Sequence, residues 1–215
     1  MPADHSNPVS TNETSESFWE RRYAQMTEPS GGRPSAALER LTADRSVGRA
    51  LELGCARGDD AIWLARQGWA VTGIDISETA LRIARSSAEA AGVADRTHFE
   101  RHDLGASFPA GTYDLVSAMF LQSPVQFGRV QALRRAAASV SPGGLLLIAT
   151  HGSRSPWSSA PPDMAFPTAQ EELSALRLAS ENWRNIFVGE IERMGSEPAG
   201  QRAMVTDAIV AIERL

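Results

Sequence analysis

Two carboxylates and two glycines lie at spacings that suit a nucleotide-binding turn. Glu52 precedes Gly54 and Gly58, and Asp75 ends a second apolar segment 21 positions after Gly54. Glycines let a ligand approach the backbone closely, and a carboxylate about 20 residues later can accept hydrogen bonds from ribose hydroxyls. The spacing therefore predicts a site for a ligand that contains adenosine.

Glu52 narrows the choice of that ligand, because a carboxylate repels a pyrophosphate and attracts a cation. The dinucleotide fingerprint also needs a third glycine, which is missing, and the chain has no lysine for a P-loop. S-adenosylmethionine carries an ammonium and a sulfonium and no phosphate. The residues therefore favour S-adenosylmethionine over NAD. An alternative stays open, in which Glu52 caps backbone amides and the glycines only form a tight turn.

A second group of residues could face a methyl acceptor. Methyl transfer needs alignment of the nucleophile and exclusion of water more than it needs a catalytic triad. His151 follows an apolar strand directly, and histidine is the side chain that most often acts as a general base, so it is the candidate catalytic residue. Trp19, Tyr23, Phe120 and Gln122 are candidates for the substrate pocket, together with His151. The aromatic residues could instead pack in the core, and Gln122 could only cap its loop.

These residues must be positioned by alternating strands and helices. Strands are predicted over residues 49–54, 69–75, 97–101, 113–119, 145–150, 183–194 and 203–212, and helices over 16–26, 35–41, 59–67, 77–91, part of 125–138 and 168–178. Ser141-Pro142-Gly143-Gly144 is typical of a turn before the fifth strand. Strands that alternate with helices predict right-handed crossovers and a mostly parallel, doubly wound α/β sheet.

Length and composition predict one domain. Residues 1–15 are expected to be a disordered tail, and the single domain covers 16–215, with a helical lid over 16–41, a cofactor-binding core over 49–150, and a loop, helix and closing strands over 151–215. The net charge of −5 disfavours nucleic acid, and the absence of a long apolar run disfavours a membrane. One cysteine excludes a cysteine-cluster metal site, so no metal is expected. We expect a cytoplasmic monomer or homodimer.

The chain resembles class I S-adenosylmethionine-dependent methyltransferases, in particular small bacterial members related to the tellurite-resistance and thiopurine methyltransferases. The resemblance rests on residues 18–23, 51–65, 71–77, 102–104, 113–116 and 141–144, which occur in the family's order. It implies a Rossmann-like seven-stranded sheet with an antiparallel C-terminal hairpin. It also implies S-adenosyl-L-methionine as cofactor, S-adenosyl-L-homocysteine as product and a small-molecule methyl acceptor.

The resemblance also implies roles for individual residues. The methionine part would be held by Glu52 and by the backbone of Gly54, Cys55, Ala56 and Gly58. Asp75 would bind the ribose, and Met119 and Phe120 would face the sulfonium. At the adenine, Ile76 and Leu104 would lie beside the ring and Asp103 would accept a hydrogen bond from its amino group. One position departs from the family pattern, because Ala56 replaces the middle glycine of the turn. Alanine disfavours positive φ, so we expect Ala56 to adopt an ordinary backbone conformation.

The resemblance leaves more than one chemical class open for the atom that accepts the methyl group. From the resemblance alone, a small thiol or another soft chalcogen is the first choice, and an oxygen or nitrogen atom of a natural product is a close second. Two alternatives of other classes are a non-catalytic S-adenosylmethionine-binding regulatory protein and a nicotinamide-dependent oxidoreductase. The latter conflicts with Glu52 and with the missing third glycine.

Overall fold

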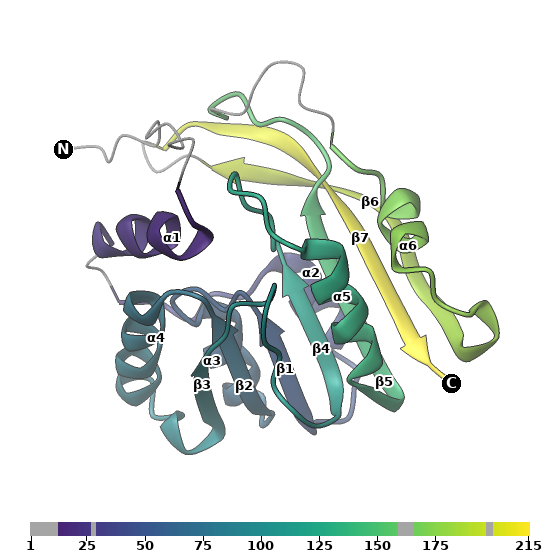
Figure 1. Cartoon of the computed structure of the whole chain (residues 1–215), viewed down its shortest axis with the longest axis horizontal. Helices are drawn as coiled ribbons and strands as arrows, with labels where there is room; N and C mark the ends of the chain where they lie inside the picture. The colour runs from purple at the N-terminus through teal and green to yellow at the C-terminus, as the bar shows by residue number, and fades with distance from the viewer. Residues whose placement is uncertain (1–12, 27–28, 159–165, 197–199) are drawn as a thin grey trace.

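The computed structural model describes residues 13–26, 29–158, 166–196 and 200–215, so the first twelve residues of the expected tail and part of the loop after His151 lie outside it. Seven strands form one sheet in the order β3-β2-β1-β4-β5-β7-β6 (Figure 1). The strands are β1 (Arg49–Leu53), β2 (Ala70–Asp75), β3 (Thr97–Arg101), β4 (Tyr113–Met119), β5 (Val140–His151), β6 (Trp183–Ser196) and β7 (Arg202–Arg214).

The first five strands are parallel, and β7 runs antiparallel to both β5 and β6. The predicted mostly parallel sheet with an antiparallel C-terminal hairpin is therefore confirmed. The parallel arrangement brings the carboxyl ends of β1 to β5 to one edge of the sheet, which is where α/β proteins of this topology bind ligands.

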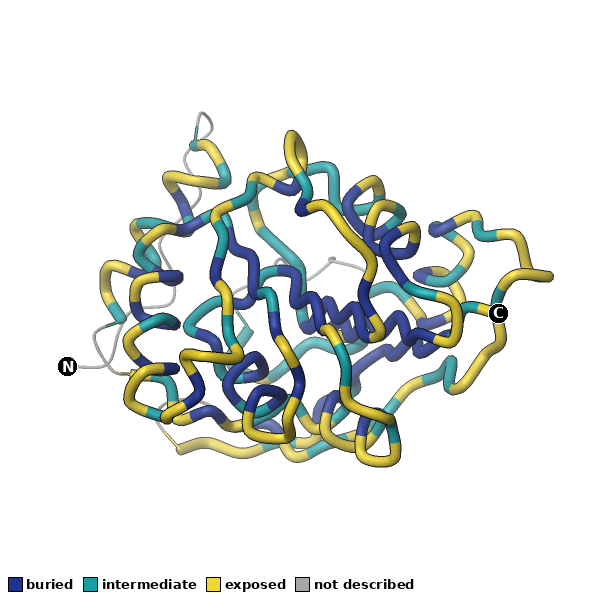
Figure 2. The backbone as a smooth tube through the Cα atoms, turned by 90° about the horizontal axis from the view of Figure 1, so that it is seen from below, coloured by how far each residue is buried: buried dark blue, intermediate teal, exposed yellow. Residues whose placement is uncertain are grey.

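Helices cover both faces of the sheet. They are α1 (Ser15–Ala24), α2 (Ala36–Thr42), α3 (Asp59–Arg66), α4 (Glu78–Ala90), α5 (Arg129–Ala138) and α6 (Ala169–Leu176), with short 3-10 turns at Ala94–Arg96 and Ser180–Asn182. Side chains of β5 alternate between two apolar clusters: Leu145 and Leu147 pack with α2, α3 and α4, while Leu146 and Ile148 pack with α5 and α6. Figure 2 shows these buried strands between more exposed helices.

Helix boundaries follow capping chemistry. Ser77 caps α4 by accepting a 3.1 Å hydrogen bond from the Ala80 amide. Thr168 and Glu171 form a reciprocal capping box at the start of α6. In the described part of the chain, no helix is long and apolar enough to cross a membrane.

The turn predicted at Ser141–Gly144 is wrong, because these residues belong to β5. Val140 pairs with Tyr113 and Leu145 pairs with Leu115, so the residues between Val140 and Leu145 form a bulge inside a continuous strand. Gly143 has φ +77 there, which glycine adopts without steric cost. Turn residues within a strand can thus mark a bulge as well as a strand boundary.

Candidate functional site

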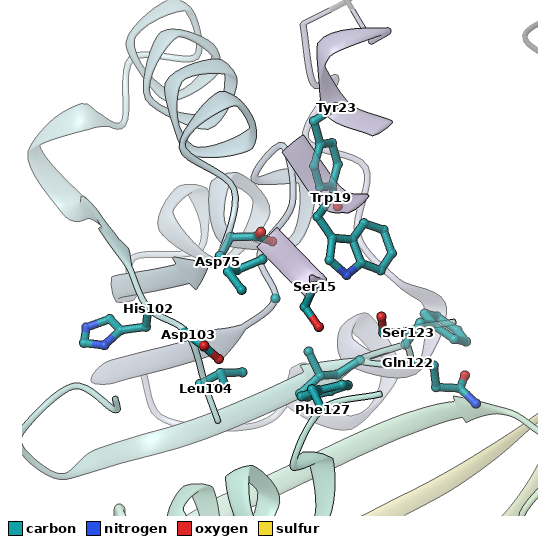
Figure 3. Close-up of a pocket in the computed structure, with 14 residues that line it drawn as sticks. Ser15, Trp19, Tyr23, Asp75, His102, Asp103, Leu104, Gln122, Ser123 and Phe127 are labelled. Carbon is teal, nitrogen blue, oxygen red and sulfur yellow. The ribbon is translucent and has the colours of Figure 1, made fainter. Parts of the chain in front are cut away.

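A pocket lies beyond the carboxyl ends of β1, β2 and β4 and beneath α1, with about 610 Å³ of empty space that is partly open to solvent (Figure 3). Its lining comes from α1, the turn after β1, and the segments after β2, β3 and β4. The lining residues are Ser15, Trp19, Tyr23, Gly54, Asp75, Ile76, His102, Asp103, Leu104, Phe120, Leu121, Gln122, Ser123 and Phe127. The fold therefore brings most of the residues singled out from the sequence to one place.

Every second residue of the turn after β1, from Gly54 to Gly58, has a positive φ. Gly54, Ala56 and Gly58 have φ of +69, +50 and +83. The expectation that Ala56 avoids positive φ is therefore wrong. The Ala56 amide donates a 3.0 Å hydrogen bond to Asp75 Oδ2, and the Cys55 amide donates a 2.9 Å bond to the Ile74 carbonyl. These bonds to β2 hold Ala56 in the left-handed region despite its methyl group.

Replacing Ala56 by glycine should therefore raise the free energy of unfolding by about 0.5–1 kcal/mol. A left-handed conformation costs a non-glycine residue about 1–2 kcal/mol, and the extra chain entropy of glycine offsets part of the relief. Denaturant unfolding measures the change. Ala91→Gly is the matched control, because Ala91 has φ −81, and that variant should not gain stability. An equal gain in both variants would contradict the strain at Ala56.

Asp75 holds the turn and lines the pocket. Its side chain is 7% exposed, Oδ2 accepts from the Ala56 amide, and Oδ1 accepts a 3.0 Å bond from the Ser77 amide. Burial raises the pKa of Asp75, although hydrogen bonds from the Ser77, Ala56 and Ile76 amides oppose the shift. Each carboxylate oxygen keeps a lone pair that a ligand hydroxyl could use.

Glu52 lies beneath the turn, and its buried carboxyl group has other acidic side chains as neighbours. It is 4% exposed, and its Oε2 has no hydrogen-bond partner among the residues that the structure describes. Burial raises its pKa well above the usual range, and the neighbouring Asp60, Asp59 and Asp75 raise it further. A buried acidic group of this kind is stabilised by a cation. Glu52 does not line the pocket itself, but a cation beside it would be favourable and a phosphate unfavourable.

The other end of the pocket suits a purine. Ile76, Asp103 and Leu104 line it, as the resemblance implies. Asp103 Oδ1 accepts a 2.9 Å bond from the Gly105 amide, which fixes the carboxylate at the start of its turn. His102 also lines this end, and its ring bonds Ser107 Oγ at 2.9 Å and Glu100 Oε2 at 3.1 Å.

Helix α1 covers the pocket with two aromatic side chains. Trp19 and Tyr23 stack with ring centroids 5.8 Å apart, and both line the cavity (Figure 3). Burial, together with the charge of Asp75, raises the pKa of Tyr23 far above its usual range, so its hydroxyl stays neutral. Only α1 covers the pocket, because α2, the other helix of the expected lid over residues 16–41, packs in an apolar cluster through Leu38.

Glu20 attaches this cover to the core, a role that sequence reasoning missed. Its Oε1 accepts bonds of 2.5 Å from the Glu78 amide and 3.2 Å from the Thr79 amide, at the start of α4. Partial burial raises the pKa of Glu20, but the bonds from Thr79 and Glu78 outweigh it and leave the pKa lowered. The sequence clue to this role was the acidic residue next to Trp19 in the covering helix. Carboxylates accept hydrogen bonds from the free amides at the start of a helix.

Replacing Glu20 by alanine should lower the free energy of unfolding by about 1 kcal/mol at pH 7, the typical value of a helix cap. Because the folded pKa is depressed, this stability exists above the ordinary value of 4.5 and is lost as pH falls through the folded pKa. Unfolding of both proteins from pH 7 to pH 3 measures it, and the difference should shrink in acid. Glu16→Ala is the control, because the partner of Glu16 in the described part of the chain is the exposed Arg101. An equal loss in that variant would contradict the capping role.

The loop after β4 forms the remaining wall. It contributes Phe120, Leu121, Gln122, Ser123 and Phe127. Of the pocket-lining residues, Ser15, His102, Leu121, Ser123 and Phe127 were not singled out from the sequence. For the loop residues the available signal was position alone, directly after a strand at the ligand-binding edge. Gln122 Oε1 accepts a 3.0 Å bond from the His151 amide, so this side chain joins its loop to β5.

Cys55, Met119 and His151 do not line the pocket, and neither do Glu52, Ala56 and Gly58. The half-exposed His151 ring stacks on Phe120 with centroids 4.6 Å apart, and its Nδ1 lies 3.8 Å from Asp207 Oδ1. Met119 and Cys55 are buried in the same apolar cluster. Burial raises the pKa of the Cys55 thiol well above its usual range, which makes a nucleophilic role unfavourable.

Comparison with known proteins agrees with this geometry. Residues 18–187 match the family model described as a methyltransferase domain. The chain is 28% identical to the ubiquinone biosynthesis O-methyltransferase of Bordetella avium over 183 residues, which are 83% of this chain and 74% of that protein. It is 33% identical to the methyltransferase GfsG of Streptomyces halstedii over 138 residues, 59% of this chain, and so spans about half, 49%, of that relative.

The fold also matches a solved structure from work on the conversion of a disulfide bond into a thioacetal group during echinomycin biosynthesis. The two have a TM-score of 0.71 and 24% identity, with 92% of this chain and 91% of that chain covered. Around the pocket, no group of three or more histidine, cysteine or acidic residues among those described could hold a metal. The chain belongs to the class I S-adenosylmethionine-dependent methyltransferases.

Proposed function

We propose that this protein transfers the methyl group of S-adenosylmethionine to a small, neutral, apolar acceptor, and that the accepting atom is the sulfur of a thiol. One observation carries the choice of acceptor. The pocket wall after β4 and beneath α1 consists of uncharged side chains, of Trp19, Tyr23, Phe120, Leu121, Gln122, Ser123 and Phe127. Among the described residues that line this wall, none carries a charge that could pair with an ionic substrate.

The cofactor would be held by the residues of the opposite end. We assign the ammonium to Glu52, the ribose hydroxyls to Asp75, the adenine amino group to Asp103 and the adenine faces to Ile76 and Leu104. When bound, S-adenosylmethionine supplies a methyl group already activated by its sulfonium. The aromatic side chains of α1 would exclude water from the reacting atoms, and the loop after β4 would orient the acceptor.

A thiol suits such a wall because it needs little help to ionise. The usual thiol pKa of about 8.5 leaves a few per cent of reactive thiolate at pH 7, whereas a phenol of pKa about 10 needs a base. An apolar pocket also selects a soft, weakly hydrated nucleophile. Family membership removes the nicotinamide-dependent alternative, and a non-catalytic binder remains the alternative that turnover would exclude.

A phenolic oxygen is the second candidate, and a separate observation favours it. His151 stacks on Phe120, beside the pocket, with its Nδ1 near Asp207, an arrangement that could orient a base. Side-chain hydrogen bonds and charges of His151 and Arg193 outweigh burial and lower the pKa of Asp207, so this carboxylate stays ionised. The relative from Bordetella avium is named as an O-methyltransferase.

A panel of neutral thiols, phenols and amines tests the proposal, with the release of S-adenosylhomocysteine as the measure of turnover. We expect small apolar thiols to react fastest, with a rate that rises towards the pKa of each thiol and changes little in His151→Ala. If phenols react fastest and His151→Ala lowers their rate by about 10²–10⁴-fold, the typical value of a general base, the oxygen acceptor is correct and the thiol is not. Binding of the cofactor without turnover of any panel member would contradict catalysis of this kind.

A further inference from the structure

The loop from Phe120 to Gly128, between β4 and α5, is fixed from two sides. On the side of β5, the Phe120 amide donates a 2.8 Å bond to the Ala149 carbonyl, and Gln122 accepts from the His151 amide. These bonds extend the pairing of β4 with β5 and are expected for a loop that leaves a strand. The bonds on the other side come from a different part of the chain.

Arg129, the first residue of α5, connects the loop to α6. Its Nε donates a 2.7 Å bond to the Leu121 carbonyl, and its Nη1 donates bonds of 2.9 Å to both carboxylate oxygens of Glu172. Its amide also donates a 2.7 Å bond to the Phe127 carbonyl. Leu121 and Phe127 both line the pocket. One side chain thus links a helix outside the cofactor-binding core to the pocket wall.

Stability alone explains this arrangement poorly. Glu172 is 5% exposed, and replacing a buried ion pair of this kind by apolar residues is often neutral or stabilising. Arg129 Nη2 is buried without a hydrogen-bond partner among the described residues. An unsatisfied buried donor costs about 1–3 kcal/mol. A pair that carries such a cost is better explained by the geometry that it imposes on the loop.

The geometry matters because Leu121 also reaches the cofactor turn. A Cβ placed on Gly54 would lie only 2.7 Å from Leu121 Cδ1, so the loop packs directly over the turn after β1. A shift of Leu121 would therefore move the wall of the pocket relative to the turn. Misplacement of reacting groups by about 1 Å can lower a rate by about 100-fold.

We propose that Arg129 and Glu172 are positioning residues that set the acceptor wall of the pocket by holding the loop at Leu121. Neither residue lines the pocket, so both act through the loop. The inference rests on the proposed methyl transfer for its kinetic consequence, whereas its structural consequence, the order of the loop, is independent of that function.

Two variants test the pair. Arg129→Lys keeps the charge but lacks the forked guanidinium that reaches both Leu121 and Glu172. The double variant Arg129→Met with Glu172→Met removes the ion pair without leaving a buried charge, so it should fold. The matched control is Arg134→Met, because Arg134 joins the same two helices through bonds of 3.2 and 2.7 Å to the Ala175 carbonyl. Within the described part of the chain, its side chain makes no hydrogen bond to the loop from Phe120 to Gly128.

Hydrogen exchange of the amides from Leu121 to Phe127 is the first measurement, followed by kinetics and calorimetry with S-adenosylhomocysteine. Both test variants should exchange these amides at least about tenfold faster and lose about 10–100-fold in kcat/KM for the acceptor, while the Kd for S-adenosylhomocysteine stays within about threefold. Arg134→Met should match the wild type in all three measurements.

Unchanged exchange in both test variants would overturn the proposal, as would an equal effect in Arg134→Met, which would show that general docking of α5 on α6 is responsible. If the wild type turned over no acceptor, the proposed function would fail. The exchange measurement would still decide whether the pair orders the loop.

Discussion

Replacing Glu52 by glutamine should lower the affinity for S-adenosylmethionine at least about 30-fold and raise the stability of the ligand-free protein. Removing one partner of a buried charge pair typically costs about 2–5 kcal/mol of binding free energy, and glutamine keeps the volume but not the charge. In the free protein the same change removes a buried carboxylate that faces Asp59, Asp60 and Asp75. Calorimetry and denaturant unfolding measure the two effects.

The gain in stability should depend on pH. Because the folded pKa of Glu52 is raised, the folded state binds more protons than the unfolded state above the ordinary value of 4.5. The contribution of Glu52 to stability is therefore fully present below pH 4.5 and declines as pH rises towards the folded pKa. The advantage of Glu52→Gln over the wild type should accordingly grow with pH. S-adenosylmethionine affinity of the wild type should rise over the same range, since the carboxylate must be ionised to pair with an ammonium.

Methylthioadenosine supplies the control on the ligand side, because it has the adenosine end and lacks the ammonium and carboxylate. It should bind the wild type and Glu52→Gln with the same affinity. Equal weakening of both ligands would show that the substitution disturbs the whole turn. Unchanged affinity for S-adenosylmethionine would contradict the assignment of the ammonium to Glu52.

The places of Glu52 and Asp75 in the fold could be predicted because each residue occupies a fixed position relative to a strand. Glu52 is inside β1 and Asp75 ends β2, so the parallel sheet brings them to one edge whatever the loops do. The apolar strands and the capping residue Ser77 were equally local signals. The number of strands and the antiparallel hairpin required the family resemblance, since strand pairing is a long-range property.

Other features could not be predicted because they depend on contacts between distant residues. The conformation of Ala56 follows from its bond to Asp75, which overrides the preference of alanine. The cap that Glu20 places on α4 joins residues far apart in the sequence. His151 was expected to follow the fifth strand but is its last residue. Its ring stacks on Phe120 instead of lining the pocket, because no local pattern fixes the direction of a side chain at a strand end.

Replacing Asp75 by alanine should lower the affinity for both S-adenosylmethionine and methylthioadenosine by about 100-fold, whereas Glu52→Gln should lower only the affinity for S-adenosylmethionine. Hydrogen bonds to a charged group contribute about 1.5–3 kcal/mol, and the ribose is common to both ligands. The substitution should also lower the free energy of unfolding by about 1–3 kcal/mol, because the buried amides of Ala56 and Ser77 lose their acceptor. Calorimetry with both ligands and denaturant unfolding measure these losses.

Asp75→Asn separates the two roles of this side chain. An asparagine keeps one carbonyl oxygen for a backbone amide, so it should recover part of the stability while ligand affinity stays low, since the charge is gone. The two positions together give a pattern that general damage cannot produce: Glu52→Gln discriminates between the ligands, and the Asp75 variants do not. If Asp75→Asn bound methylthioadenosine as the wild type does, Asp75 would serve only to hold the turn, and the ribose would have to lie elsewhere in the pocket.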